Sequence, residues 1–266
     1  MKNILLLVHN DEGQEVRLQT ALDLVRALDG HLICVDVTPP PIIAEDYYDG
    51  VVDNVILRDE SQQEAANKAL LTARLAREDI RWSWIDARGN IARCVIEAAT
   101  LADLIILNRA PGPRARPDME AITNKILMEA HKPVVAVPPK AKGFKAGGRA
   151  LIAWDGRASA ATTMRTCVPL LKLASDVRLF LARVPDEPVD HEEAAEYLSR
   201  HGIHASVQIY EGAIRSVPWL IGDEALMWHA DYILMGAYSR GRLRETFGGV
   251  TKSMLAKNRL PLVLGH

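Results

Sequence analysis

The chain has 266 residues, of which 48% are hydrophobic and 25% charged, a composition typical of globular protein with room for two domains. The net charge of −2 provides no bulk attraction to nucleic acid or to an anionic membrane, and no apolar run approaches the roughly 20 residues that cross a bilayer. The three cysteines lie far apart, which favours buried thiols in a reducing cytoplasm over a disulfide framework.

In both halves of the chain, short β-rich runs alternate with longer helical patterns. In the first half, the predicted strands are residues 3–8, 31–37, 81–86, 103–107 and 133–137, and the predicted helices are 14–28, 61–77, 91–101 and 119–130. In the second half, the predicted strands are 150–154, 176–182, 204–209, 232–235 and 260–264, and the predicted helices are 160–174, 192–201, 216–229 and 244–257. Continuously apolar strands that alternate with helices predict a doubly wound α/β fold, a parallel sheet covered on both faces.

The second half repeats the first over the length of a whole domain. Ala102-Asp103-Leu-Ile-Ile-Leu matches Ala230-Asp231-Tyr-Ile-Leu-Met, and the apolar run after Pro133 matches the run after Pro261. We therefore expect one domain over residues 1–140, a linker over 141–148 and a second domain over 149–266. The first half is the longer one because of residues 38–59, which are either a surface excursion or a lid or partner contact.

The second half places candidate binding residues where ligands bind in doubly wound folds, beyond the carboxyl ends of the strands. Asp155-Gly156 follows its first strand, and Gly236 and the run Gly248-Gly249-Val-Thr251 follow its fourth. Glycines let backbone N–H groups approach phosphate oxygens, and a helix start favours anions. Asp155 could accept a hydrogen bond from a ribose hydroxyl or an adenine amine, or could merely cap a helix. The glycine turns alone are equally compatible with a structural role.

Taken together, the repeated βαβ pattern, Asp155-Gly156 and the glycine run that ends at Thr251 resemble the universal stress protein family. ATP-binding members of that family carry Gly-x2-Gly-x9-Gly-Ser/Thr between the fourth strand and the fourth helix. The likeness covers essentially the whole chain as a tandem of two domains. It implies two five-stranded parallel sheets of order 3-2-1-4-5 with helices on both faces, in a cytoplasmic stress-response protein that often binds an adenine nucleotide.

The resemblance implies an ATP or related nucleotide site in the second half, with Asp155 at the adenosine end. Ala182 or Val184 would flank the base, and the phosphates would be surrounded by Gly236, Ser239, Gly248, Gly249 and Thr251. This chain departs from the motif at its second glycine, which is Ser239, and lacks the Ser/Thr adjacent to a glycine.

The first half has lost more of the motif. His9 and Asn108 stand where the second half has Asp155 and Gly236, and Glu120-Ala121 stand where it has Gly248-Gly249. Because a glutamate repels phosphate and alanine lacks the backbone freedom of glycine, we expect no nucleotide there.

Other functions stay open at this point. The chain could be a stress protein that binds no nucleotide and acts through dimerisation or protein contacts, a weak ATPase or other small-ligand enzyme, or a binder of another metabolite. We expect no metal site and no nucleic-acid or membrane partner. Pairing of the two halves within one chain, or a homodimer, is the expected assembly.

Overall fold

The computed structural model describes residues 1–38, 52–109, 118–183, 190–211, 216–237 and 249–266, and within residues 52–63 it describes only the helical backbone. In chain order the elements of the first half are β1 (Asn3–Val8), α1 (Gln14–Leu28), β2 (His31–Thr38), α2 (Val52–Leu75), β3 (Arg81–Arg88), α3 (Ile91–Ala98), the 3-10 turn η1 (Ala99–Leu101), β4 (Leu104–Asn108), α4 (Met119–Glu129) and β5 (Val134–Val137). Those of the second half are β6 (Arg149–Ala153), α5 (Ala158–Thr166), α6 (Val168–Leu171), β7 (Asp176–Arg183), α7 (Glu192–Arg200), β8 (Ala205–Glu211), α8 (Val217–Met227), β9 (Tyr232–Gly236), α9 (Gly249–Lys257) and β10 (Leu262–Gly265).

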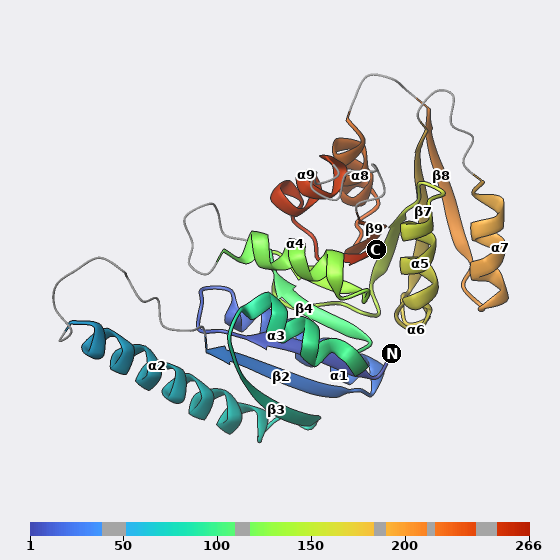
Figure 1. The fold of residues 1–266 in the computed structure, drawn as a ribbon. Coiled ribbons are helices and arrows are strands. Elements are labelled where there is room, and N and C mark those ends of the chain that lie inside the picture. Colours follow the sequence, from blue (N-terminus) through green and yellow to red (C-terminus); the bar gives the residue numbers. More distant parts are fainter. Residues whose placement is uncertain (39–51, 110–117, 184–189, 212–215, 238–248) are drawn as a thin grey trace.

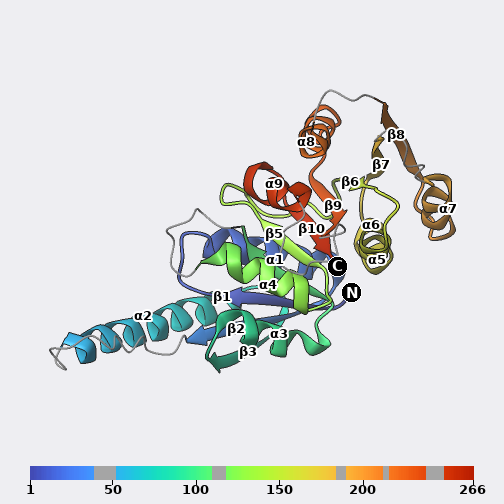
Figure 2. The same cartoon turned by 45° about the horizontal axis from the view of Figure 1, so that its top comes forward.

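The strands of the described chain form one continuous sheet in the order β3-β2-β1-β4-β5-β10-β9-β6-β7-β8. Within each half the strands are parallel and follow the predicted order 3-2-1-4-5. The halves meet where β5 and β10 run antiparallel, with Val135 opposite Val263. The two predicted sheets are therefore joined edge to edge within one chain (Figures 1 and 2).

Side chains alternate along the central strands between two cores, one on each face of the sheet. Ile4 and Leu6 belong to the core formed with α1, α2, α5, α6 and α7, whereas Leu5 and Leu7 belong to the core formed with α3, α4, α8 and α9. Burial on both faces explains why these strands read as continuous apolar runs. Within the described residues, no helix is both long and apolar enough to cross a membrane.

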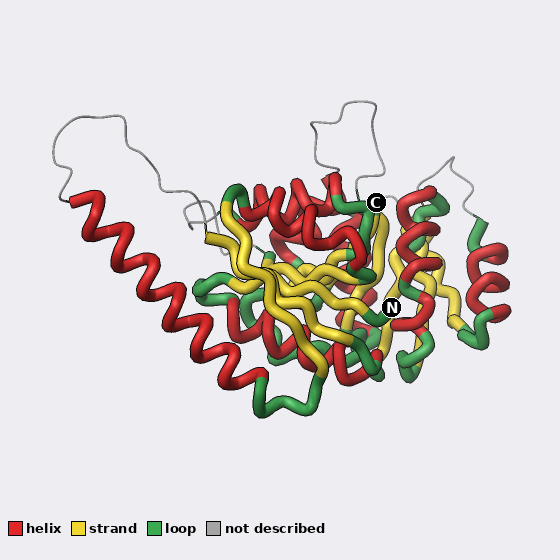
Figure 3. Tube along the Cα trace, turned by 60° about the horizontal axis from the view of Figure 1, so that its bottom comes forward, coloured by secondary structure: helices red, strands yellow, loops and turns green. Residues whose placement is uncertain are grey.

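Two predicted helices differ clearly from the observed ones. In addition, the last residues of the helix expected over 91–101 form the turn η1, and residues 244–248 of the helix expected over 244–257 lie outside the described residues. The expected helix over residues 160–174 is wrong as a single element, because α5 and α6 are separate helices divided at Cys167. Pro169 explains the break, since it lacks an N–H for the helical ladder and its ring collides with the carbonyl four residues earlier. Helix α2 begins at Val52 instead of residue 61, so the 38–59 segment is helical from residue 52 onward. The first turns of α2 project beyond the sheet (Figure 3).

The repeated Ala-Asp pair has the same structural role in both halves. One oxygen of Asp103 accepts hydrogen bonds from the backbone N–H groups of Lys2 (2.7 Å) and Asn3 (2.9 Å). The same oxygen of Asp231 accepts from the N–H of Arg149 at 2.9 Å. Each aspartate thus ties the start of the fourth strand of its half to the start of the first. This role accounts for the best-preserved part of the repeat without reference to a ligand.

The segment between the halves, residues 141–148, is packed into the structure at Phe144. The ring of Phe144 is 4% exposed and lies 4.8 Å, centroid to centroid, from the buried ring of Tyr232 in β9. Its backbone N–H donates to the carboxylate of Asp23 in α1 at 2.9 Å. The side chain of Phe144 therefore packs on the second half while its backbone is bonded to the first.

We expect Phe144→Ala to lower the free energy of unfolding by about 3–5 kcal/mol, because it removes a buried ring and leaves a cavity against Tyr232. Urea denaturation followed by circular dichroism measures this change. The control is Leu101→Ala, which truncates a leucine that is 80% exposed and should cost well under half as much. Equal losses in the two variants would contradict the anchoring role of Phe144.

Candidate functional site

In doubly wound folds ligands bind at the topological switch point, where the chain leaves the first and fourth strands in opposite directions; we call this position the crevice of each half. In the first half this point lies beyond β1 and β4, and in the second half beyond β6 and β9. Because β5 and β10 are antiparallel, the carboxyl edges of the two halves lie at opposite edges of the continuous sheet. The two crevices are therefore separate, and each is built mainly from its own half.

Asp155 lies directly beyond β6 in the second half. One of its carboxylate oxygens accepts a hydrogen bond from the N–H of Arg157 at 3.1 Å, which makes a turn at the start of α5. Gly156 within this turn has φ of 71°, a left-handed conformation that favours glycine. The Asp155 side chain is 45% exposed. The carboxylate thus shapes the turn and still faces solvent.

Gly236 ends β9, where the amino end of α5 approaches the strand closely. A Cβ at this position would lie 2.5 Å from the backbone N of Ala160 and 2.5 Å from Oγ of Ser159. Since real Cβ atoms do not come this near to other heavy atoms, the packing of α5 on β9 requires glycine at position 236. Gly236 therefore has a structural reason to be glycine, and it brings the amino end of a helix to the crevice.

Gly249 and Thr251 lie in the first turn of α9, on the other side of the crevice. A Cβ at Gly249 would meet no atom of the described residues within 4 Å, so the described packing does not require a glycine here. Thr251 is only 3% exposed. Its counterpart in the first half, Thr123, is 2% exposed and donates from Oγ1 to the backbone oxygen of Asn108 at 3.0 Å.

The other predicted site residues are only partly placed. Ala182 is half-buried near the end of β7, where it pairs in register with Tyr210 of β8. Val184, Ser239 and Gly248 lie outside the described residues. Their predicted contacts with a base or with phosphates stay predictions.

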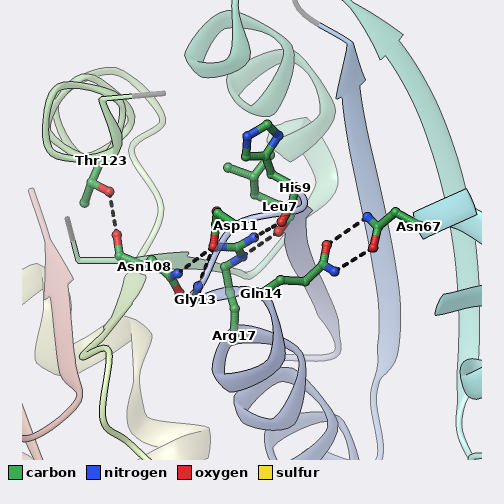
Figure 4. Close-up of polar contacts among 9 residues, drawn as sticks. All are labelled: Leu7, His9, Asp11, Gly13, Gln14, Arg17, Asn67, Asn108 and Thr123. Atoms are coloured by element: carbon green, nitrogen blue, oxygen red, sulfur yellow. Dashed lines mark hydrogen bonds and ion pairs between the residues drawn. The ribbon is translucent and has the colours of Figure 1, made fainter. Parts of the chain in front are cut away.

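The matching crevice of the first half holds a buried arginine. Arg17 of α1 has no exposed surface, and its Nε donates to the backbone oxygen of Leu7 at 2.8 Å. The two terminal nitrogens donate to the backbone oxygen of His9 at 2.9 Å and to Oδ2 of Asp11 at 3.0 Å (Figure 4). Burial lowers the pKa of Arg17, which Asp11 opposes. The guanidinium is thus held by the end of β1 and the loop that follows.

Asn108, the last residue of β4, completes this network. Its Nδ2 donates to Oδ1 of Asp11 at 3.3 Å, and the N–H of Gly13 donates to the same oxygen at 2.7 Å (Figure 4). A Cβ at Gly13 would lie 1.4 Å from Nδ2 of Asn108, so Asn108 occupies the space that a side chain at position 13 would need. The second half reverses this arrangement, with a side chain at Ser159 and glycine at 236.

Arg17 and Asp11 were not predicted as site residues from the sequence. The sequence signal for this site was an arginine on the apolar stripe of the predicted helix. Position 17 lies one residue before Leu18 and four before Ala21, which places its side chain next to theirs on the helix surface. An arginine on a core-facing stripe requires a partner, and Asp11 is the third carboxylate that precedes it, after Glu15 and Glu12.

His9 lies at the mouth of this crevice, where the second half has Asp155. Its backbone oxygen is bonded to Arg17, while the imidazole points away from the network (Figure 4). Burial lowers the pKa of His9, and Asp11 opposes that shift. The neutral ring therefore predominates at pH 7 and provides no cation for a phosphate group.

Carboxylates gather beside His9, at the ends of β2 and β3. Burial, and then the charges of Glu64 and Asp86, raise the pKa of Asp36 to about 6. Lys68 opposes the shift, and its ammonium lies 2.6 Å from Asp86. This edge of the first-half crevice is thus acidic, an unfavourable environment for polyphosphate. Among the described residues no group of three or more His, Cys, Asp or Glu side chains could hold a metal ion.

We expect Arg17→Met to lower the free energy of unfolding by about 3–5 kcal/mol, because it leaves Asp11 without its buried partner. Urea denaturation at pH 7 measures the loss. Arg26→Met is the control, since Arg26 lies on the same helix in a more exposed pair with Glu78 and should cost about 1 kcal/mol or less. A loss in Arg17→Met as small as in the control would show that the network is not needed for stability.

Asp36 predicts a dependence of stability on pH. The unfolded pKa of an aspartate is about 3.9, so between that pH and about 6 the folded state binds more protons and its stability falls as the pH rises. Asp36→Asn should therefore raise the free energy of unfolding by about 1 kcal/mol at pH 7, allowing for screening of a partly exposed group, and leave it unchanged near pH ~4. The control is Asp79→Asn, which removes the same charge from an exposed turn and should change the free energy of unfolding by no more than about 0.5 kcal/mol at pH 7.

Comparisons with known proteins agree with this architecture. The universal stress protein family model matches residues 1–138. A universal stress protein from Archaeoglobus fulgidus DSM 4304 has 14% sequence identity and a TM-score of 0.77, over 99% of this chain and 97% of that one. A functionally unknown protein from Pseudomonas aeruginosa PAO1 has 17% identity and a TM-score of 0.63, over 100% and 92% of the two chains. No curated protein matches the sequence.

At these identities the solved structures establish the shared fold alone, and the family model provides the assignment. Its match spans just over half of the chain and covers the half with the closed crevice. The chain belongs to the universal stress protein family.

Proposed function

We propose that this protein is a stress-response binding protein that holds ATP or a related adenine nucleotide in the crevice of its second half. The observation that carries the proposal is the difference between the crevices. Arg17, Asp11 and Asn108 fill the first, whereas the second has, at Gly249, a glycine whose Cβ would meet no described atom within 4 Å, and a partly exposed carboxylate at Asp155. Membership of the family supports the same function.

In the proposed complex the phosphates lie at the start of α9. The N–H groups of a first helical turn have no partner within the helix and favour an anion. The open space above Gly249, measured against the described residues, would let phosphate oxygens approach the backbone. Ser239, Gly248 and Thr251 would complete this end of the site, as the family motif implies. Gly236 would contribute by bringing the start of α5 close.

The adenosine end would lie against Asp155. The exposed part of its carboxylate could accept from the ribose hydroxyls or from the adenine amine. Ala182 and Val184, at the end of β7, would flank the base. Binding rather than catalysis is the proposed role, and ATP hydrolysis forms no part of it.

Residues 1–140 and 149–266 are proposed as two domains of this family joined by residues 141–148. The first would carry no nucleotide, because its crevice is filled and its rim is acidic. The pairing of β5 with β10 already brings the halves together within one chain. We propose a cytoplasmic location, as for the family.

Calorimetric titration with ATP tests the site. Asp155→Ala and Gly249→Glu should each weaken binding at least tenfold, about 1.4 kcal/mol or more. Gly249→Gln is the matched control for charge, because it adds a side chain of nearly the same size without a carboxylate and should bind more tightly than Gly249→Glu. His9→Ala, in the first-half crevice, should bind as the wild type does.

Two outcomes would overturn the proposal. If the wild type takes up no adenine nucleotide, a stress protein that acts through protein contacts becomes the better account. If ATP binds but Asp155→Ala and Gly249→Glu bind as well as the wild type, the nucleotide lies elsewhere. Mass spectrometry of gently purified protein adds an independent check, since a co-purifying nucleotide should disappear in Gly249→Glu.

A further inference from the structure

Arg109 crosses from the first half of the chain to the second. It follows β4 directly, and its backbone N–H donates to the oxygen of Val137 at the end of β5 (2.9 Å). Its side chain continues over the seam between β5 and β10, where Nη1 donates to the backbone oxygen of Met254 at 2.9 Å and Nη2 donates to that of Asn258. The residue is only 5% exposed. This buried cation is therefore bonded to the carboxyl end of α9.

A helix end is a favourable place for such a cation. Carbonyl groups at the end of a helix carry a partial negative charge, which a guanidinium bonded to them stabilises. The oxygen of Met254 also accepts from the N–H of Asn258 at 3.0 Å, so Arg109 adds a second hydrogen bond to it. Burial lowers the pKa of Arg109 to about 10, which still leaves the side chain charged at pH 7. Its forked geometry reaches two carbonyls at once, which a lysine ammonium does less well.

Helix α9 packs on the core of its sheet face through Met254, with Val250 and Leu255 partly buried against the same core. Of its nine residues, Thr251 and Met254 are buried. A groove of about 760 Å³ lies along α8 and the carboxyl end of α9, with Trp219 and Leu226 among the lining residues on the α8 side. A small cavity of about 40 Å³ lies between α4 and α9, bordered by Arg109 itself. Arg109 therefore bonds α9 at an end that borders both spaces.

The position that matches Arg109 in the second half has a short side chain. It is Ala237, which likewise bonds its backbone N–H to the neighbouring strand, at Gly265 (2.7 Å), but whose methyl group cannot reach α4. At this position the first half thus supports the helix that begins the candidate phosphate site of the second, whereas the matching residue does not do the same for α4.

We propose that Arg109 is a positioning residue for the phosphate end of the nucleotide site, acting from the first half through the whole length of α9. This inference rests on the proposed function. At about 1.5 Å per residue the helix is short and stiff, so fixing Met254 and Asn258 at one end also fixes Gly249 and Thr251 at the other. The first half would then contribute to nucleotide binding although its own crevice is closed.

Calorimetric titration of Arg109→Met and Arg109→Lys with ATP and with adenosine tests this role. Arg109→Met should lose about tenfold in ATP affinity, 1.4 kcal/mol, and less than twofold in adenosine affinity, because adenosine does not reach α9. Arg109→Lys should recover part of the ATP affinity. The control is Lys125→Met, which removes an exposed positive charge from α4 and should leave both affinities unchanged.

Hydrogen exchange without nucleotide provides a second readout. The amides of α9 should exchange faster in Arg109→Met than in the wild type, while those of β1 and β4 should not change. If wild-type protein binds no nucleotide, both the proposed function and this inference are overturned. If the wild type binds ATP and Arg109→Met keeps the same ratio of ATP to adenosine affinity, the inference alone fails.

Discussion

The antiparallel pairing of β5 with β10 is the constraint on which the arrangement of the whole molecule depends. It joins two five-stranded halves into one sheet, and because the strands meet head to tail it places the carboxyl edge of each half beside the amino edge of the other. Two parallel neighbours at this seam would have put both crevices on one edge. The observed pairing separates them and brings the residue that follows β4 against the end of α9.

The two crevices differ mainly in how they fill the space between the first helix and the end of the fourth strand. In the first half Asn108 fills it and position 13 is glycine; in the second half Ser159 fills it and position 236 is glycine. The space between helix and strand is thus filled in both halves, by a side chain of the strand in the first half and by a side chain of the helix in the second. What the first half adds is Arg17, whose guanidinium is bonded to Leu7, His9 and Asp11 of the same half instead of facing a ligand.

Much of the fold could be predicted from sequence because its signals are local. The apolar stripe of α1 predicted both of its ends, and Pro169 could have indicated the break between α5 and α6. The continuous sheet could not be predicted in this way, because the apolar sequences of β5 and β10 do not indicate that these two strands pair with each other. The packing of the linker could not be predicted from local signals either, because burial of Phe144 depends on Tyr232, far away in the chain.

The candidate site was predicted less fully, and its glycines now carry unequal weight. Gly236 resembles a family motif residue, but the close approach of Ala160 requires glycine there whether or not a ligand binds. Gly249 is different, because no described residue lies near enough to forbid a side chain. A glycine that the surrounding packing does not explain is better evidence for a ligand than one that it does. The case for a nucleotide therefore rests more on the start of α9 than on the end of β9, and it is this helix whose other end Arg109 holds.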